Sequence, residues 1–256
     1  MVQVPKHKLV LEVPGGAKRV LLHTCCAPCS SAIIEIMLQQ GITPTIFYSN
    51  SNIFPLEEYL HRKDECTRYA QSLGLEIVDD DYEHADWRSC AALGLENEPE
   101  RGARCLACFK YRLLRAARYA SSHGFTVLTT TLASSRWKDL AQVDAAGRWA
   151  CAQVNSSLSP ACDQVDIPNN QACDTVSSTL TTCHPDHLTC LPDPTSQHPD
   201  PLTCHPERNE GSASPVIWWG QNWRKGGLQD RRSQIIREMN FYNQQYCGCE
   251  YSLRNK

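Results

Sequence analysis

Short apolar segments alternate with longer segments of helical spacing through residues 19–130 of this 256-residue chain. The strand-like segments are Arg19–Thr24, Thr43–Tyr48, Leu75–Val78 and Thr126–Thr130. A β-α-β-α-β-α-β order predicts a parallel, doubly wound sheet. In such sheets ligands bind at the carboxyl ends of the strands, near the point where the strand order reverses. We therefore expect an α/β fold with its functional site after one of these strands.

Helix signals lie between the strands. Ser30 is a candidate N-cap for a first helix that ends at Gly41. A second helix is predicted over Pro55–Leu73, and a third from near Cys105 to His123. Helices of this length suit the crossover connections that parallel strands require.

The stretch Cys151–Pro215 differs from the rest of the chain. It holds nine of the fifteen prolines and no Phe, Trp or Tyr, and the element Thr182–Asp186 returns as Thr203–Glu207. Such a segment cannot bury enough apolar surface to offset its ordering entropy. We expect one domain, formed by residues 17–150 and 216–254, that is interrupted by a disordered, low-complexity insertion at 151–215.

Several protein classes are excluded by composition. No run of about 18 apolar residues is present, so no membrane span is predicted. Residues Met1–Val20 lack the apolar run of a signal peptide, so we expect a cytoplasmic protein without a membrane partner. The net charge is −3, but the insertion is strongly acidic and leaves the remainder net positive. A basic body is compatible with an RNA substrate.

Fifteen cysteines are an unusual number for such a chain. In a reducing compartment they favour metal binding or redox catalysis, and an odd number cannot form a complete disulfide framework. Outside the insertion, six of the nine cysteines form close pairs: Cys25 with Cys26, Cys105 with Cys108, and Cys247 with Cys249. Close spacing brings two thiolate ligands to one metal centre together.

The first two pairs lie near predicted helix starts, where the helix dipole lowers a thiol pKa and favours a metal-bound thiolate. A four-cysteine cluster from Cys25, Cys26, Cys105 and Cys108 is therefore chemically reasonable. Three alternatives remain from the residues alone: a thioredoxin-like redox pair, buried core thiols, and zinc. Structural zinc sites are usually closed by a second C-x-x-C or a His pair, and the segments outside the insertion supply neither.

Other residues receive simpler interpretations. His23 lies inside an apolar strand and is expected to be a hydrogen-bonded structural residue. Cys66 shares a helical stripe with core positions, and Cys90 is assigned no role. Basic residues gather near the cysteine pairs, which favours an anionic substrate over a merely solvated helix face. They are Arg101, Arg104, Lys110, Arg112, Arg115, Arg118, Arg136, Lys138, Arg224, Lys225, Arg231, Arg232 and Arg237.

The chain resembles the cobalamin-independent epoxyqueuosine reductases, a QueH-like family, over essentially its whole length except the insertion. The motifs that carry the resemblance occur in the family's order. They are LLHTCCAPCS at 21–30, YSNSNI at 48–53 with Glu58–Tyr59, CLACFKYRL at 105–113, TTTL at 129–132 leading to Lys138–Asp139, WRKGG at 223–227 and YCGCEYSL at 246–253.

The resemblance implies a HUP-like, Rossmann-like α/β fold and a [4Fe-4S] cluster held by Cys25, Cys26, Cys105 and Cys108. It implies reduction of epoxyqueuosine to queuosine at the tRNA wobble position, the last step of queuosine biosynthesis. Cys247 and Cys249 would be a redox-active pair or, with Cys29, ligands of an adjacent mononuclear iron. Removing the epoxide oxygen requires two electrons, a proton and a group that polarises the oxygen. Asp139 is a candidate iron ligand or proton donor, or simply a helix N-cap.

The electron donor is expected to be a protein of the ferredoxin or flavodoxin type. No G-x-x-x-x-G-K-[ST] or G-x-G-x-x-G motif is present, so hydride delivery from a bound nicotinamide has no support. Two alternative functions follow from the same residues. One is a structural zinc-binding RNA module without catalysis. The other is a sulfur-transferring tRNA enzyme, which would ordinarily require a phosphate-binding loop.

Overall fold

The structure is a computed structural model that describes residues 9–156, 215–242 and 244–252. The chain divides into two compact units, and every described residue belongs to the one formed by residues 1–164 and 213–256. Most of the predicted insertion therefore lies outside the described residues. None of the described helices is long and apolar enough to cross a membrane.

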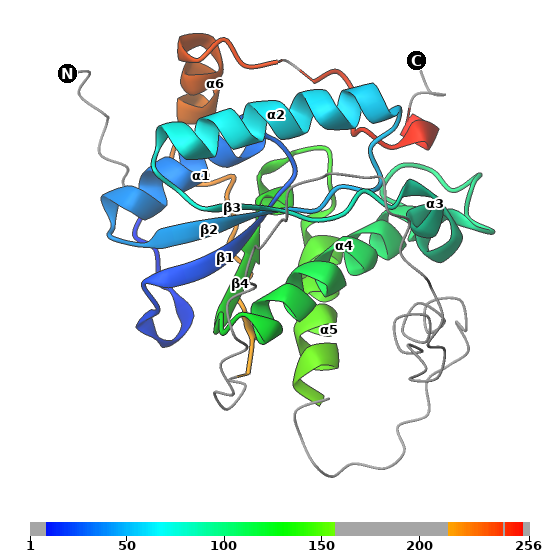
Figure 1. The fold of residues 1–256 in the computed structure, drawn as a ribbon, viewed down its shortest axis with the longest axis horizontal. Coiled ribbons are helices and arrows are strands. Elements are labelled where there is room, and N and C mark those ends of the chain that lie inside the picture. The colour runs from blue at the N-terminus through cyan, green and yellow to red at the C-terminus, as the bar shows by residue number, and fades with distance from the viewer. Residues whose placement is uncertain (1–8, 157–214, 243, 253–256) are drawn as a thin grey trace, which may run out of the picture. The chain divides into compact units, whose positions relative to one another are not determined.

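The unit is built on one parallel sheet with strand order β3-β2-β1-β4-β5 (Figure 1). The strands are β1 (Arg19–Thr24), β2 (Thr43–Tyr48), β3 (Ile77–Asp79), β4 (Val127–Thr130) and β5 (Ile217–Trp218). In the register, Leu22 of β1 lies between Ile46 of β2 and Thr129 of β4. The strand order reverses between β1 and β4, so the predicted doubly wound α/β fold is confirmed. The fifth strand was not expected.

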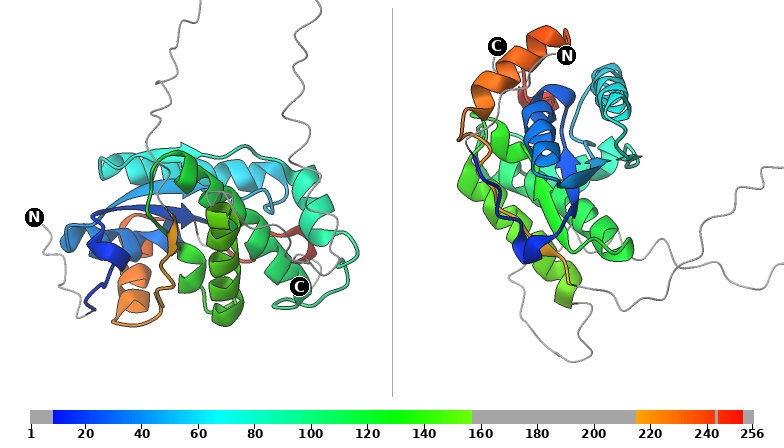
Figure 2. Two further views of the ribbon diagram at one scale, coloured as in Figure 1. Left: turned by 90° about the horizontal axis from the view of Figure 1, so that it is seen from below. Right: turned by 90° about the vertical axis from the view of Figure 1, so that its left-hand side faces the viewer.

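The main helices are α1 (Ala27–Gln39), α2 (Leu56–Ser72), α3 (His84–Trp87), α4 (Ala103–Ser122), α5 (Leu140–Ser156) and α6 (Leu228–Glu238). Short helical turns are η1 (Pro14–Gly16), η2 (Arg88–Ala92), η3 (Thr131–Ser134) and η5 (Glu250–Ser252). Helices α1, α2 and α6 cover one face of the sheet, and α4 and α5 cover the other (Figures 1 and 2).

The first helix begins earlier than the sequence indicates. Cys26 occupies the N-cap position of α1, and Pro28 lies in the first turn, where its missing N–H costs no hydrogen bond. The prediction that Ser30 caps this helix is wrong. Its hydroxyl instead donates to the carbonyl of Cys26 at 3.1 Å. The shift places Cys26 directly at the junction between β1 and α1.

The predicted start of the insertion is six residues too early, because α5 continues to Ser156 and buries Cys151 and Val154. The residues that flank positions 157–214 lie side by side. The Asn155 amide donates to the Val216 carbonyl at 3.0 Å and accepts the Val216 N–H at 2.9 Å. The described parts of the chain that flank residues 157–214 are therefore in direct contact.

Candidate metal and thiol site

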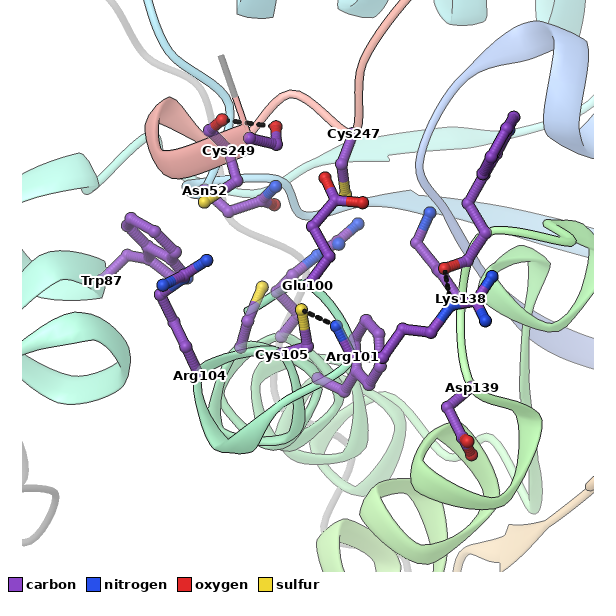
Figure 3. Close-up of a pocket in the computed structure, with 15 residues that line it drawn as sticks. Asn52, Trp87, Glu100, Arg101, Arg104, Cys105, Lys138, Asp139, Cys247 and Cys249 are labelled. Atoms are coloured by element: carbon purple, nitrogen blue, oxygen red, sulfur yellow. Dashed lines mark hydrogen bonds between the residues drawn. The ribbon is translucent and has the colours of Figure 1, made fainter. Parts of the chain in front are cut away.

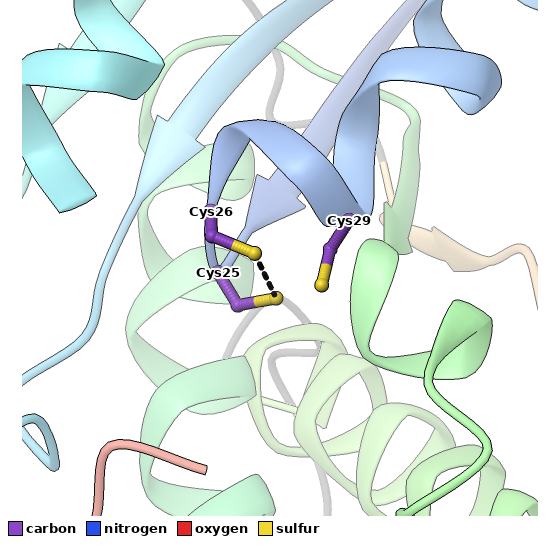
Figure 4. A group of neighbouring side chains, drawn as sticks. All are labelled: Cys25, Cys26 and Cys29. Carbon is purple, nitrogen blue, oxygen red and sulfur yellow. Dashed lines mark hydrogen bonds between the residues drawn. The ribbon is translucent and has the colours of Figure 1, made fainter. Parts of the chain in front are cut away.

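A group of three thiols lies where β1 passes into α1. The sulfur atoms of Cys25, Cys26 and Cys29 all lie within 4.8 Å of one another, and the Cys25 and Cys26 sulfurs are 3.8 Å apart (Figure 4). All three side chains are buried. Cys29 joins the group because it lies on the first turn of α1, directly after the N-cap Cys26. Within the described residues, this is the group of three or more closely placed metal-ligating side chains.

The three thiols differ in their pKa values. Hydrogen bonds from the thiols of Cys26 and Cys29 lower the pKa of Cys25 well below its ordinary value, against the effect of burial. Burial raises the pKa of Cys26, and the hydrogen bond to Cys25 raises that of Cys29 to about 11. The site thus favours a first thiolate at Cys25 and resists further ionisation. A metal ion would relieve that resistance by replacing the remaining protons, which is the behaviour of a soft-metal site.

A second set of thiols lines a small cavity of about 40 Å³ beside the first group (Figure 3). Cys105 and Cys108 come from the first turns of α4, and Cys247 and Cys249 come from the C-terminal segment. The cavity is also lined by Asn52, Lys138 and Asp139, among others. The spacing of the C-x-x-C pair on a helix accounts for the way both its thiols reach one cavity.

Gly248 explains how Cys247 and Cys249 reach this place. Its φ of +102° lies in the region that glycine favours, and a Cβ there would lie 2.9 Å from Cγ1 of Ile53. The Gly248 carbonyl accepts the Phe54 N–H at 2.9 Å. Arg62, which is buried, donates to the carbonyl of Cys247 at 3.3 Å. These contacts hold the C-terminal segment against the loop after β2.

Three thiols of the second set, Cys105, Cys108 and Cys249, are poor acids. Burial raises the pKa of Cys105 to about 11 and that of Cys249 to about 12, and it also raises that of Cys108. The expectation that the helix start lowers the pKa of Cys105 and Cys108 is therefore wrong. Burial outweighs the dipole, even though the Arg101 N–H donates to the Cys105 sulfur at 3.3 Å.

A larger cavity of about 710 Å³ adjoins the small one and is lined by Cys25, Cys29 and Cys247. Its size suits a small ligand or a nucleobase. The two cavities share a set of lining residues, which joins the two groups of thiols into one site. The shared residues are Asn52, Glu100, Arg112, Trp137, Lys138, Cys247 and Ser252.

Positive charge dominates the larger cavity. Its charged lining residues are Arg62, Arg112, Lys138, Arg232 and a single acid, Glu100. Burial alone would lower the pKa of Lys138, but attraction to the thiolate forms of Cys247, Cys25 and Cys29 raises it above its ordinary value, and the pKa of the Cys25 thiol is itself lowered. Lys138 therefore carries a proton at neutral pH while it faces these thiols.

Asp139 and His23 have structural partners. Oδ1 of Asp139 accepts the Gln142 N–H at 2.9 Å, which caps the start of α5, while the residue also lines the small cavity. His23 is fully buried between Thr130 Oγ1 at 2.7 Å and the Ser49 carbonyl at 3.1 Å. Burial lowers the pKa of His23 to about 3, so the predicted structural role of this residue is confirmed.

Asn52 and Trp137 were not singled out by the sequence. The side-chain oxygen of Asn52 is buried without a hydrogen-bond partner, and the residue lines both cavities. Trp137 also lines both cavities and is largely exposed. Asn52 stands within the motif YSNSNI and could have been found there. Trp137 carried no sequence signal, because only the packing of its loop brings it to the thiols.

The chain matches the family described as epoxyqueuosine reductase QueH over residues 20–161 and 166–255. The protein of that name from Haemophilus influenzae is 36% identical over 245 residues, which are 96% of this chain and 76% of the relative. The protein of that name from Acinetobacter baylyi is 34% identical over 250 residues, which are 98% of this chain and 87% of the relative.

Proposed function

This chain belongs to the epoxyqueuosine reductase QueH family, and on that premise we propose that it reduces epoxyqueuosine at the wobble position of tRNA to queuosine, the last step of queuosine biosynthesis. Release of the epoxide oxygen as water consumes two electrons and two protons. The single proton expected from the sequence would release the oxygen only as hydroxide. The observation that supports this chemistry best is the convergence of thiols from three distant segments on two adjoining cavities.

The thiols fit an iron–sulfur centre, because the donor set is soft, largely buried and free of disulfides among the described residues. We assign Cys25, Cys26, Cys105 and Cys108 to a [4Fe-4S] cluster. When bound, the cluster would supply single electrons and an adjacent iron would polarise the epoxide oxygen. We assign Cys247 and Cys249 to a redox-active pair or, with Cys29 and Asp139, to that iron.

The chain's own side chains prepare the larger cavity for the substrate. Lys138 holds a proton at Nζ beside Cys25 and Cys247, where it can be given to the departing oxygen. Asn52 presents a buried amide oxygen that lacks a partner in the protein, and a hydroxyl of the substrate would satisfy it. These two residues orient the reacting ring without themselves being oxidised.

The cations that surround the cavity suit an RNA backbone. Arg112 donates to the Ser49 carbonyl at 3.1 Å, and Arg232 donates to the Pro28 carbonyl at 2.9 Å. Because these partners are neutral, they do not cancel the positive charge of either guanidinium group. Arg112 is buried, so Arg232, which is partly exposed, is the one of the two that a phosphate group can reach. We propose that the electron donor is a protein of the ferredoxin or flavodoxin type and that the enzyme works in the cytoplasm.

Nucleoside analysis of tRNA from a bacterial strain without any epoxyqueuosine reductase tests the proposal. Expression of this chain should convert accumulated epoxyqueuosine to queuosine. The Cys26→Ser variant should not, whereas Cys151→Ser should behave like the wild type, because Cys151 is also buried but lies in α5, outside the group of Cys25, Cys26 and Cys29 and outside both cavities. Persistence of epoxyqueuosine with the wild-type protein present would refute the proposed activity.

Metal analysis after anaerobic purification tests the cofactor separately. We expect iron and acid-labile sulfide, with a visible absorption band that air bleaches. A colourless protein with stoichiometric zinc would instead support the zinc-binding RNA module. The Cys26→Ser and Cys108→Ser variants should each lose iron, while Cys151→Ser should retain it.

A further inference from the structure

One tryptophan stands apart from the others. All six tryptophans of the chain lie in its described part, and Trp137 alone among them is largely exposed, at 64%. Trp87 and Trp223 are fully buried, as tryptophans in a core are expected to be. Trp137 lies at the rim that both cavities share. A ligand that stacks on the indole would account for its exposure beside a site for a nucleoside.

The backbone that carries Trp137 is held firmly. The Arg101 side chain donates to the carbonyls of Trp137 at 2.9 Å and Arg136 at 3.2 Å. The Arg224 guanidinium donates to the carbonyl of Lys138 at 2.7 Å, on the other side of the tryptophan. The indole is therefore exposed on a fixed segment, which lowers the entropy cost of stacking a ligand on it.

The charge around Trp137 is positive. The Arg136 guanidinium lies 5.1 Å from the centre of the Trp137 ring, and Arg101 and Arg136 are both exposed. Arg101 and Arg224 use their hydrogen bonds on neutral backbone carbonyls, and Asp139 attracts Arg224 without a described ion pair. An exposed aromatic ring beside several arginines is the arrangement with which proteins bind unpaired bases and their phosphates.

We propose that Trp137 is a stacking platform for the unpaired anticodon-loop base that flanks the modified base. This inference rests on the proposed function, which requires the wobble base to leave its stack and enter the larger cavity. Extrusion of one base uncovers the face of its neighbour, and an indole at the rim restores the lost stacking. Trp137 is a positioning residue, because it acts on the RNA outside the reacting atoms.

Binding of a synthetic tRNA anticodon stem–loop tests the platform. Trp137→Leu keeps an apolar side chain without a π face, and Trp137→Phe keeps a smaller ring. We expect Trp137→Leu to raise the dissociation constant by about 5- to 150-fold, the loss of one stacked base, and Trp137→Phe to raise it less. Leu93→Ala, which removes an exposed apolar side chain elsewhere, should leave binding unchanged.

An RNA with an abasic site beside the wobble position gives the decisive comparison. When the abasic site lies on one particular side of the wobble base, the abasic RNA should bind the wild type more weakly than the intact RNA does. Trp137→Leu should bind both RNAs equally, because this variant lacks the indole on which the missing base would stack. If the abasic penalty is the same for both proteins on both sides, or if the wild type does not bind the RNA, the platform is refuted.

Turnover with tRNA from the reductase-deficient strain separates this inference from the proposed function. We expect Trp137→Leu to raise KM and to leave kcat within about twofold, because stacking acts through binding. If the wild type produces queuosine and Trp137→Leu has an unchanged KM, only the platform fails. If the wild type produces none while it shows the expected abasic effect, only the proposed function fails.

Discussion

The backbone N–H of Arg101 points at the sulfur of Cys105, 3.3 Å away, while the side chain of the same arginine holds the carbonyl of Trp137. Figure 3 shows the contact between Arg101 and Cys105. One residue thus connects a thiol of the small cavity with the loop that bears the exposed indole. Arg101 has a φ of +67°, a conformation that residues other than glycine rarely adopt. The contacts around Arg101 are what keep it in this conformation.

Substitutions of Arg101 should separate its backbone role from its side-chain role. Arg101→Gly and Arg101→Ala both remove the hydrogen bonds to the Trp137 loop, so both should weaken RNA binding. Glycine accepts the positive φ without a steric penalty, so Arg101→Gly should be more stable than Arg101→Ala by about 1 kcal/mol. Urea unfolding measures this difference. Equal stability of the two variants would show that the backbone at this position is unstrained.

Asn52 should lower the stability of the fold and be required for activity. Its buried, unpartnered oxygen costs about 1–3 kcal/mol of folding free energy. Asn52→Leu, of similar shape, should therefore match or exceed the wild type in free energy of unfolding while it loses turnover of tRNA. Chemical denaturation and a turnover assay on the same preparations test this. Full activity in Asn52→Leu would show that the substrate does not use this amide.

Alkylation rates should rank the cysteines of the metal-free protein. Cys247 is exposed, whereas burial raises the pKa of Cys151 to about 12. At neutral pH the thiolate population of Cys151 is roughly a thousandfold below that of an ordinary thiol, so Cys151 should react far more slowly than Cys247. Mass spectrometry of tryptic peptides gives the order. Iron loading should then protect Cys25, Cys26, Cys105 and Cys108 and leave Cys151 unchanged. Modification of Cys151 as fast as Cys247 would contradict the described packing.

Excision of residues 157–214 should leave the enzyme active. Asn155 and Val216 are already joined by two hydrogen bonds, so a short glycine–serine linker can span the deletion. We expect iron content and turnover within about twofold of the full-length chain. Limited proteolysis of the intact protein should likewise cut first within this segment and spare the visible absorption. Loss of iron on excision or cleavage would assign the segment a role in the site.

The spacing of apolar residues predicted most of the strands and helices, because buried parallel strands and amphipathic helices have strong local sequence patterns. It failed where local signals were short or contradictory. Two-residue β5 is too short to be recognised, and its pairing with β4 depends on a return of the chain after residue 214. The start of α1 was placed too late because Ser30 is a typical N-cap residue, whereas Pro28, which a helix tolerates in its first turn, is consistent with the earlier start.

The sequence predicted which cysteines form the candidate site better than it predicted their pKa values. The short spacing predicted that Cys105 lies with Cys108 and Cys247 with Cys249, because residues two or three positions apart stay close in any fold. The thiol pKa values were not predictable, because burial depends on segments that are distant in sequence. Cys105 shows this, since burial outweighs its position on the first turn of α4. The assignment of individual ligands to the iron centres stays a prediction.

The central claim is that the thiols hold iron for the reduction of epoxyqueuosine. Its most direct test is anaerobic incubation of the purified, iron-loaded protein with dithionite and tRNA that carries epoxyqueuosine, followed by mass spectrometry of the nucleosides. We predict that queuosine appears as epoxyqueuosine disappears, and that Cys26→Ser abolishes the conversion. Unchanged epoxyqueuosine, with iron and bound tRNA both confirmed in the same sample, would contradict the claim.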